Sequence, residues 1–238
     1  MTKCRFHIAH AHSGGTAISD PSAEHHESNR HFYDRIAEAY DFIADSNERA
    51  ARQAGVQTLA LKPGEAALEL GFGTGNEILD LAGLVGSTGK VAGIDISAGM
   101  LAVAKRKLAA NVPAAPVDLR VGDARSLPFP DASFDAVYTS FTLELFPEAD
   151  IPVALAEARR VLKPGGRFGV VSMATVRPGH RTSTLERVYV WMHRHFPHLV
   201  DCRPIDTEGV VSAAGFKITA VQDLEIWTMP VRVVVGER

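Results

Sequence analysis

From residue 66 onward, short apolar runs alternate with longer stretches in which apolar residues recur at helical spacing. This alternation is typical of a mostly parallel sheet that is covered by helices on both faces. The sequence therefore predicts an α/β fold with a doubly wound, seven-stranded, Rossmann-like sheet whose last strand is antiparallel. The predicted strands are about 66–70, 90–95, 117–121, 134–139, 167–173, 216–226 and 229–235, and the predicted helices are about 75–84, 98–110, 150–162 and 206–214.

Three stretches lie outside this alternation. Residues 1–28 are rich in His, Ser, Gly and Ala without periodicity, so we expect a mobile tail followed by one domain over residues 29–238. Apolar residues recur at helical spacing in the stretch 31–43, and a second helix should follow at about 50–61, both as caps on the sheet. Residues 175–204 are predicted to be a helical insertion, because the apolar residues of 183–200 fall on one helical face.

One strand runs directly into closely spaced glycines and then into a helix, at residues 66–76. Glycine suits such a turn because the backbone can adopt positive φ and a ligand can approach where a Cβ would intrude. A dinucleotide-binding turn, G-x-G-x-x-G, would need its last glycine where Asn76 stands. Glu69, just before the turn, would repel a pyrophosphate and suits a ligand with cationic groups. S-adenosylmethionine (AdoMet), with an ammonium, a sulfonium and no phosphate, is such a ligand.

The next predicted strand ends in an acid, Asp95, which in doubly wound sheets accepts hydrogen bonds from ribose hydroxyls. With the glycine turn, Val121-Gly122-Asp123-Ala124, Ser133-Phe134-Asp135-Ala136-Val137 and the run 160–167 (RVLKPGGR), the chain resembles the class I AdoMet-dependent methyltransferases over roughly residues 30–172. The run 33–41 (YDRIAEAYD) and the Leu-Lys-Pro-Gly-Gly turn look most similar to the branch of quinone-biosynthesis C-methyltransferases and small-molecule and lipid methyltransferases.

This resemblance implies the methyltransferase version of the fold, AdoMet as cofactor with S-adenosylhomocysteine as product, and a small-molecule or lipophilic methyl acceptor such as a quinone precursor or a lipid. AdoMet should lie across the carboxyl ends of the first three strands, where the strand order reverses, and the insertion 175–204 should cover the acceptor. The expected cofactor-binding residues are Glu69, Gly71, Gly73, Gly75, Asp95, Ile96, Met100, Asp123, Ala124 and Ser140.

Methyl transfer from a sulfonium needs alignment, exclusion of water and, for some acceptors, removal of a proton, so no fixed triad is expected. The sequence offers no convincing Ser/His/Asp or Cys/His nucleophile set, zinc-binding helix or Walker lysine. The candidates for catalysis are Tyr33, Tyr40 and His195. The reference pKa of histidine, about 6.5, suits a base near neutral pH. Other candidate bases or acceptor-orienting groups are Glu144, His193 and Asp201.

Composition and charge narrow the remaining classes. Hydrophobic residues make up 46% and charged residues 22% of the 238 residues, as in ordinary globular proteins. A net charge of −3 without a basic tract argues against a general nucleic-acid surface. The sequence has no signal-peptide pattern and no apolar run of about 18 residues, so we expect a cytoplasmic protein without stable membrane insertion. Two cysteines and no standard zinc spacing predict neither a disulfide framework nor a metal site.

Two other functions stay open at this point. A non-catalytic AdoMet-binding or scaffold protein would keep the same binding residues, because binding and catalysis are separable. A nicotinamide-dependent oxidoreductase is opposed by Asn76 and Glu69. The sequence identifies neither the acceptor nor whether its carbon, oxygen or nitrogen is methylated, and it is compatible with a monomer or a homodimer.

Overall fold

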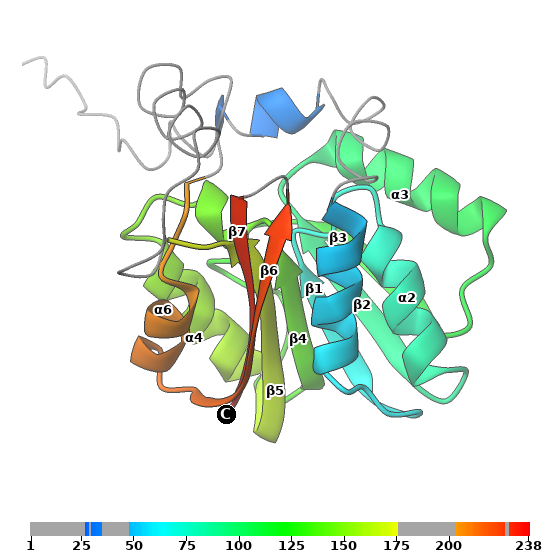
Figure 1. The fold of residues 1–238 in the computed structure, drawn as a ribbon. Coiled ribbons are helices and arrows are strands. Elements are labelled where there is room, and N and C mark those ends of the chain that lie inside the picture. The colour runs from blue at the N-terminus through cyan, green and yellow to red at the C-terminus, as the bar shows by residue number, and fades with distance from the viewer. Residues whose placement is uncertain (1–26, 29, 35–47, 176–202, 227–228) are drawn as a thin grey trace, which may run out of the picture.

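The computed structural model describes residues 27–28, 30–34, 48–175, 203–226 and 229–238, which include a seven-stranded sheet with helices on both faces (Figure 1). A helix over residues 48–58 precedes the sheet. The strands are β1 (Ala66–Leu70), β2 (Lys90–Asp95), β3 (Val117–Val121), β4 (Phe134–Ser140), β5 (Leu162–Met173), β6 (Lys217–Ile226) and β7 (Met229–Glu237). The helices that follow are α2 (Asn76–Val85), α3 (Ala98–Ala110), the 3-10 turn η1 (Leu143–Leu145), α4 (Ile151–Val161) and α6 (Thr207–Ala213).

The strand order is β3-β2-β1-β4-β5-β7-β6. The first five strands pair in parallel, whereas β7 pairs antiparallel with both β5 and β6. This confirms the predicted doubly wound, mostly parallel sheet. The order reverses between β1 and β4, because the chain crosses back over β1 after β3. In such sheets the reversal opens a crevice at the carboxyl ends of the strands.

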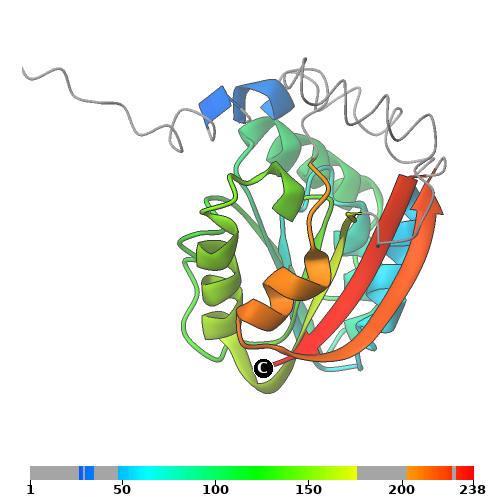
Figure 2. The same ribbon diagram turned by 60° about the vertical axis from the view of Figure 1, so that its left-hand side comes forward.

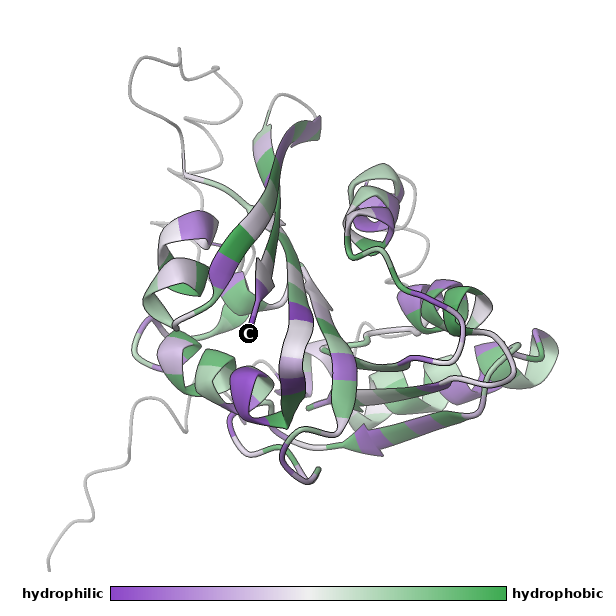
Figure 3. Ribbon diagram, turned by 90° about the horizontal axis from the view of Figure 1, so that it is seen from below, coloured by the Kyte–Doolittle hydropathy of each residue, from purple (hydrophilic) through white to green (hydrophobic). Residues whose placement is uncertain are grey.

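Two apolar layers cover the sheet. One packs the helix over residues 48–58, α2 and α3 on one face, and the other packs α4 and α6 on the opposite face. Figure 2 shows α4 and α6 together on one side, and Figure 3, seen from below, shows helices on both sides of the sheet. Along β1, Leu68 and Leu70 point into one layer and Ala67 into the other. Both faces of the strand are buried, which explains its continuous apolar sequence.

The predicted boundaries agree closely with those observed, and the largest difference is at β5. This strand begins at Leu162, whereas the prediction began at Arg167. Leu162 already pairs with Phe134, and the register then shifts so that Arg167 pairs with Ala136. The Pro-Gly-Gly turn therefore lies inside the strand as an irregularity, with Gly165 at a φ of +73°. The predictions for the tail 1–26, for residues 35–47 and for most of the insertion 175–204 lie outside the described residues.

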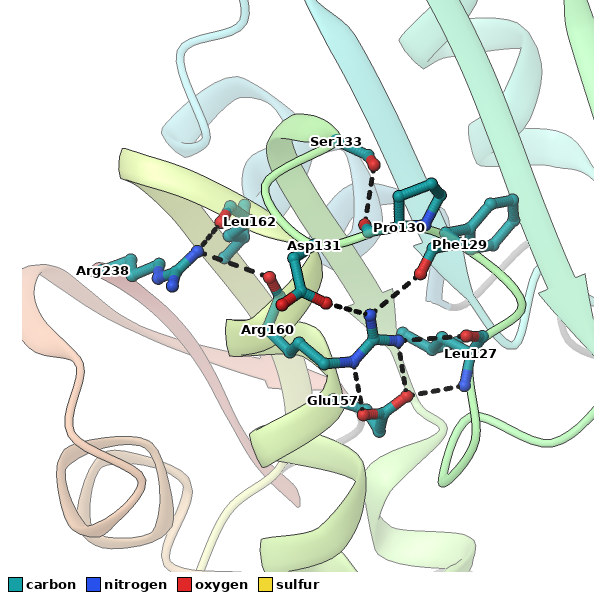
Figure 4. Close-up of polar contacts among 9 residues, drawn as sticks. All are labelled: Leu127, Phe129, Pro130, Asp131, Ser133, Glu157, Arg160, Leu162 and Arg238. Carbon is teal, nitrogen blue, oxygen red and sulfur yellow. Dashed lines mark hydrogen bonds and ion pairs between the residues drawn. The ribbon is translucent and has the colours of Figure 1, made fainter.

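A hydrogen-bond network around Arg160 in α4 holds the loop between β3 and β4 (Figure 4). The Arg160 guanidinium donates to the carbonyl oxygens of Phe129 at 2.9 Å and Leu127 at 3.0 Å. It also binds the carboxylates of Asp131 and Glu157, and Glu157 accepts the Leu127 N–H at 2.8 Å. Because this loop has no strand partner for these backbone groups, one side chain supplies the donors that a sheet would otherwise provide.

We expect Arg160→Ala to lower the free energy of unfolding by about 1–3 kcal/mol, because two backbone carbonyls lose their charged donor. Urea denaturation followed by circular dichroism measures the change. Arg120→Ala is the matched control: Arg120 lies over the Phe129 ring of the same loop, but it is exposed and pairs with exposed Asp118. Its loss should be much smaller, and equal losses in the two variants would contradict the role given to Arg160.

Candidate active site

The turn between β1 and α2 contains three glycines with positive φ, namely Gly71 (+71°), Gly73 (+50°) and Gly75 (+83°), and their surroundings differ. A Cβ on Gly71 would lie 2.4 Å from Thr142 Oγ1, and one on Gly75 would lie 3.0 Å from the Cβ of Ala104 in α3. A Cβ on Gly73 would meet nothing within 4 Å. Gly71 and Gly75 therefore allow close packing inside the protein, whereas Gly73 faces open space.

Asp95, at the end of β2, connects this turn to the next one. Its Oδ2 accepts the Gly73 N–H at 2.8 Å, and its Oδ1 accepts the Ser97 N–H at 2.9 Å. Burial raises the pKa of Asp95 to about 6, against the opposing effect of these backbone donors. A carboxylate oxygen can accept more than one hydrogen bond, so Asp95 retains acceptor capacity for a ligand hydroxyl.

A cavity of about 960 Å³, part of it open to solvent, lies at the carboxyl ends of β1, β2, β3 and β4. It brings together residues from the N-terminal segment, the helix over residues 48–58 and four strand ends. The predicted site residues in its wall are Tyr33, Gly71, Gly73, Asp95, Ile96, Met100, Asp123, Ala124 and Ser140. Glu69 and Gly75, which were also predicted, do not line it.

Three charged residues of the cavity wall form a cluster that sequence reasoning missed. Arg52 Nε lies 2.9 Å from Glu77 Oε1, and Arg52 Nη1 lies 3.2 Å from Glu48 Oε2. Tyr138, in β4, donates its hydroxyl to the carbonyl oxygen of Arg52 at 2.9 Å and so fixes the helix over residues 48–58 to the sheet. No local pattern marks Glu48 or Arg52, because they reach the cavity only through the packing of their helix.

Glu69 lies in β1 directly before the glycine turn and is fully buried. Neither of its carboxylate oxygens has a hydrogen-bond partner among the described residues. Burial raises the pKa of Glu69 well above its ordinary value, the nearby Glu77 raises it further, and Arg52 opposes both. An acid in this position adds to the negative charge around the cavity whenever it ionises.

Asp123, predicted to meet an adenine, lies in the cavity wall but is also held by a second residue. Arg125 binds it through Nε, at 3.1 and 3.0 Å from the two carboxylate oxygens, and through Nη2 at 2.7 Å. The other end of the guanidinium donates to Asp150 Oδ2 at 3.0 Å. The sequence contained a signal for Arg125, since an arginine two residues from an acid in a turn can fold back on it, but the prediction did not include it.

The chain after β4 completes the wall with apolar groups. Phe141 has a φ of +47°, a strained value for a residue that is not glycine, and it leads into η1. Phe141, Leu145 and Phe146 line the cavity. Glu144, a predicted candidate base, is buried beside the cavity instead: its Oε1 accepts the Met173 N–H at 3.0 Å, and burial raises its pKa to about 7. Because β4 adjoins β1 in the sheet, residues after it could have been anticipated at the crevice.

Tyr33 is thus the one initial catalytic candidate that the structure places, whereas Tyr40 and His195, like His193 and Asp201, lie outside the described residues. Within the described ranges there is no group of three or more His, Cys, Asp or Glu side chains arranged to hold a metal ion. None of the helices described is both long and apolar enough to cross a membrane. The cytoplasmic location and the oligomeric state stay predictions.

Comparison with known proteins confirms the resemblance. Residues 67–166 match a family model described as a methyltransferase domain. The chain is 42% identical over 154 residues to demethylmenaquinone methyltransferase of Symbiobacterium thermophilum, covering 62% of this chain and 60% of that protein. It is 39% identical over 145 residues to 2-phytyl-1,4-naphtoquinone methyltransferase of Synechococcus elongatus, covering 59% and 61%. The chain thus spans about three fifths of the length of the curated relatives it matches.

Solved structures support the same fold at lower identity. A SAM-dependent methyltransferase from Aquifex aeolicus superimposes with a TM-score of 0.61 at 19% identity, covering 86% of this chain and 97% of that one. A geranyl diphosphate methyltransferase in complex with GPP and sinefungin gives 0.62 at 18% identity, covering 80% and 77%. The (4+2)-cyclase SpnF gives 0.62 at 21% identity, covering 79% of each chain. These likenesses establish a Rossmann-like methyltransferase fold.

Glu69→Gln tests the charge state of the buried acid. Because the pKa of Glu69 is raised on folding, the folded protein keeps this proton where the unfolded chain has lost it, and stability falls as the pH rises above about 4.5. The glutamine removes this dependence. The stability of Glu69→Gln relative to the unsubstituted protein should therefore be higher at about pH 8 than at about pH 5 in urea denaturation.

Glu157→Gln provides a control of opposite sign. The hydrogen bond from Arg160 lowers the pKa of Glu157, so its contribution is present above its unfolded-state pKa and is lost as the pH falls through the folded-state pKa. This variant should lose more stability at about pH 7 than at about pH 4. If Glu69→Gln behaved in the same direction as Glu157→Gln, the inferred charge state of Glu69 would be wrong.

Proposed function

We propose that this chain is an AdoMet-dependent methyltransferase whose acceptor is a lipophilic quinone precursor. The observation that carries the proposal is the open Gly73 turn beside Asp95, at the crevice of a methyltransferase fold. The sequence similarity to two naphthoquinone-type methyltransferases supports the choice of acceptor, as their names state such substrates.

The residues present fit AdoMet as a ligand. Gly73 leaves room for the methionine portion, since no atom of the described residues beyond its chain neighbours lies within 4 Å of the place of a side chain there. Because all five residues line the cavity, we infer that Asp95 accepts the ribose hydroxyls, that Asp123 with Ala124 meets the adenine, and that Ile96 and Met100 flank the adenine. Glu48 and Glu77 place carboxylates in the cavity wall beside Arg52, and carboxylates there suit a ligand with cationic groups.

AdoMet supplies a methyl group that is already activated by its bond to a positively charged sulfur. The chain's own task is to exclude water and hold the acceptor in line, and Phe141, Leu145 and Phe146 give the cavity an apolar wall for this. A naphthoquinol ring carbon is electron-rich enough to accept the methyl group, whereas the oxidised quinone is not. AdoMet held near Gly73 and Asp95 would supply the methyl group to this carbon, with the electron pair of the broken sulfur–carbon bond staying on sulfur and the ring carbon releasing its proton to solvent.

The fold alone does not decide between methyl transfer and another use of the same cavity. A cyclase shares this architecture at 21% identity, so a Rossmann-like methyltransferase fold is compatible with different chemistry. A protein that binds AdoMet without transferring its methyl group is therefore the second candidate.

Mass spectrometry with trideuteromethyl AdoMet separates the two candidates. With demethylmenaquinol kept reduced, we expect a product in which one trideuteromethyl group replaces one hydrogen, and S-adenosylhomocysteine in equal amount. The oxidised quinone is the control and should yield no product. AdoMet binding by calorimetry without labelled product from the quinol, or from other lipophilic acceptors in a cell extract, would favour the non-catalytic candidate.

Gly73→Ala tests where AdoMet lies. A methyl group there projects into otherwise open space, so we expect the affinity for AdoMet in isothermal titration calorimetry to fall at least about tenfold. Gly165→Ala is the matched control: Gly165 also has positive φ (+73°), and a Cβ there meets only Glu237 Oε1 at 4.0 Å, but it does not line the cavity. Both variants carry backbone strain. Only the first should lose AdoMet, and equal affinities would show that the Gly73 turn does not contact it.

A further inference from the structure

The N-terminal residues 30–34 are joined to the amino end of α3 by the side chain of Asp34. Ser97 Oγ donates to Asp34 Oδ1 at 2.6 Å, and the Gly99 N–H donates to the same oxygen at 2.8 Å. Although burial acts in the opposite direction, these two hydrogen bonds lower the pKa of Asp34. The group is therefore a carboxylate at neutral pH, and it lies where the partial positive charge of a helix N-terminus stabilises a negative charge.

The contact is close-packed as well as polar. A Cβ on Gly99 would lie 2.9 Å from both the Cα and the carbonyl oxygen of Asp34, so the backbone at Asp34 lies directly against this glycine. Ser97 is the N-cap of α3, and its Oγ also accepts the Met100 N–H at 3.0 Å. One serine hydroxyl thus caps the helix and holds the N-terminal segment at the same time.

Both partners of this contact, the segment that contains Asp34 and the turn that contains Ser97, adjoin residues that line the cavity. Tyr33, the neighbour of Asp34, lines the cavity, and so do Asp95 and Ile96, which directly precede Ser97. The Ser97 N–H donates to Asp95 while its hydroxyl donates to Asp34. Figure 1 shows residues 27–28 and 30–34, in blue, above the carboxyl ends of the parallel strands. Any displacement of Asp34 would move Tyr33 relative to Asp95.

We propose that Asp34 is a positioning residue for the methyl donor: its carboxylate fixes residues 30–34 to Ser97 and Gly99, so that Tyr33 closes the AdoMet site opposite Asp95. The assignment rests on the proposed AdoMet function and adds a residue that does not itself line the cavity. It predicts that displacement of Asp34 weakens donor binding even where α3 is made more stable.

Gly99→Ala separates this role from a structural one. Alanine is favoured over glycine inside a helix, but its Cβ would displace the backbone of Asp34. We expect the dissociation constant for AdoMet, from isothermal titration calorimetry, to rise at least about fivefold, while the thermal midpoint stays within about 3 °C of that of the unsubstituted protein. Gly83→Ala is the matched control, since Gly83 lies in α2 with nothing within 4 Å of its Cβ position, and its affinity should not change.

Two substitutions of Asp34 itself complete the test. Asp34→Ala removes both hydrogen bonds and should raise the dissociation constant by at least about fivefold as well, whereas Asp34→Asn keeps an oxygen that can accept both and should stay within about twofold. If AdoMet affinity were unchanged in Gly99→Ala and Asp34→Ala, the role assigned to Asp34 would be wrong, whereas the proposed function would stand. Absence of AdoMet binding by the unsubstituted protein would overturn the proposed function, and this assignment with it.

Discussion

The carboxylate of Asp95 is the interaction on which the cavity depends. It accepts one backbone N–H from the turn after β1 and one from the turn after β2, and thereby sets the distance between two loops that end neighbouring parallel strands. Because burial raises its pKa to about 6, ionised Asp95 opposes folding and is held by its backbone donors. Ionisable groups whose pKa is shifted by burial are typical of functional sites, where a bound ligand can give them further hydrogen bonds.

The charges in the cavity wall beside Arg52 are influenced by burial as well. Glu77 lies 2.9 Å from Arg52, and in addition to burial its charge repels an ionised Glu69 and helps to raise the pKa of that acid. An uncharged or anionic ligand would leave this repulsion in place, whereas a cation relieves it. The electrostatics thus favours a ligand class, although it does not identify the acceptor.

The apolar wall of the cavity depends on a different part of the chain. The crevice exists because the strand order reverses between β1 and β4, and many proteins of this architecture share it. On this side the cavity is lined by Phe141, which has a strained backbone, and by apolar residues that follow it. The cyclase with the same fold illustrates that the crevice is general, while the chemistry depends on what lines it.

The sequence by itself determined the elements of the fold and the central part of the site. Hydrophobic periodicity is a local property, so it located β1, β2 and β3 with their observed boundaries. The glycine turn and Asp95 were recognisable because they directly end strands, and parallel strands bring their carboxyl ends to one edge. The resemblance to the methyltransferase family also indicated Asp123 and Ser140, and both line the cavity.

Only the tertiary structure decided which distant segments complete that site. Glu48 and Arg52 reach the cavity through helix packing, and Asp34 meets Ser97 across 63 positions of sequence. It also divided the glycines by role, because Gly75 packs on Ala104 while Gly73 faces the cavity. These outcomes depend on how helices cross the sheet and on which side chains then meet. No local pattern of residues encodes that, since the free energy of each contact exists only once both segments are packed.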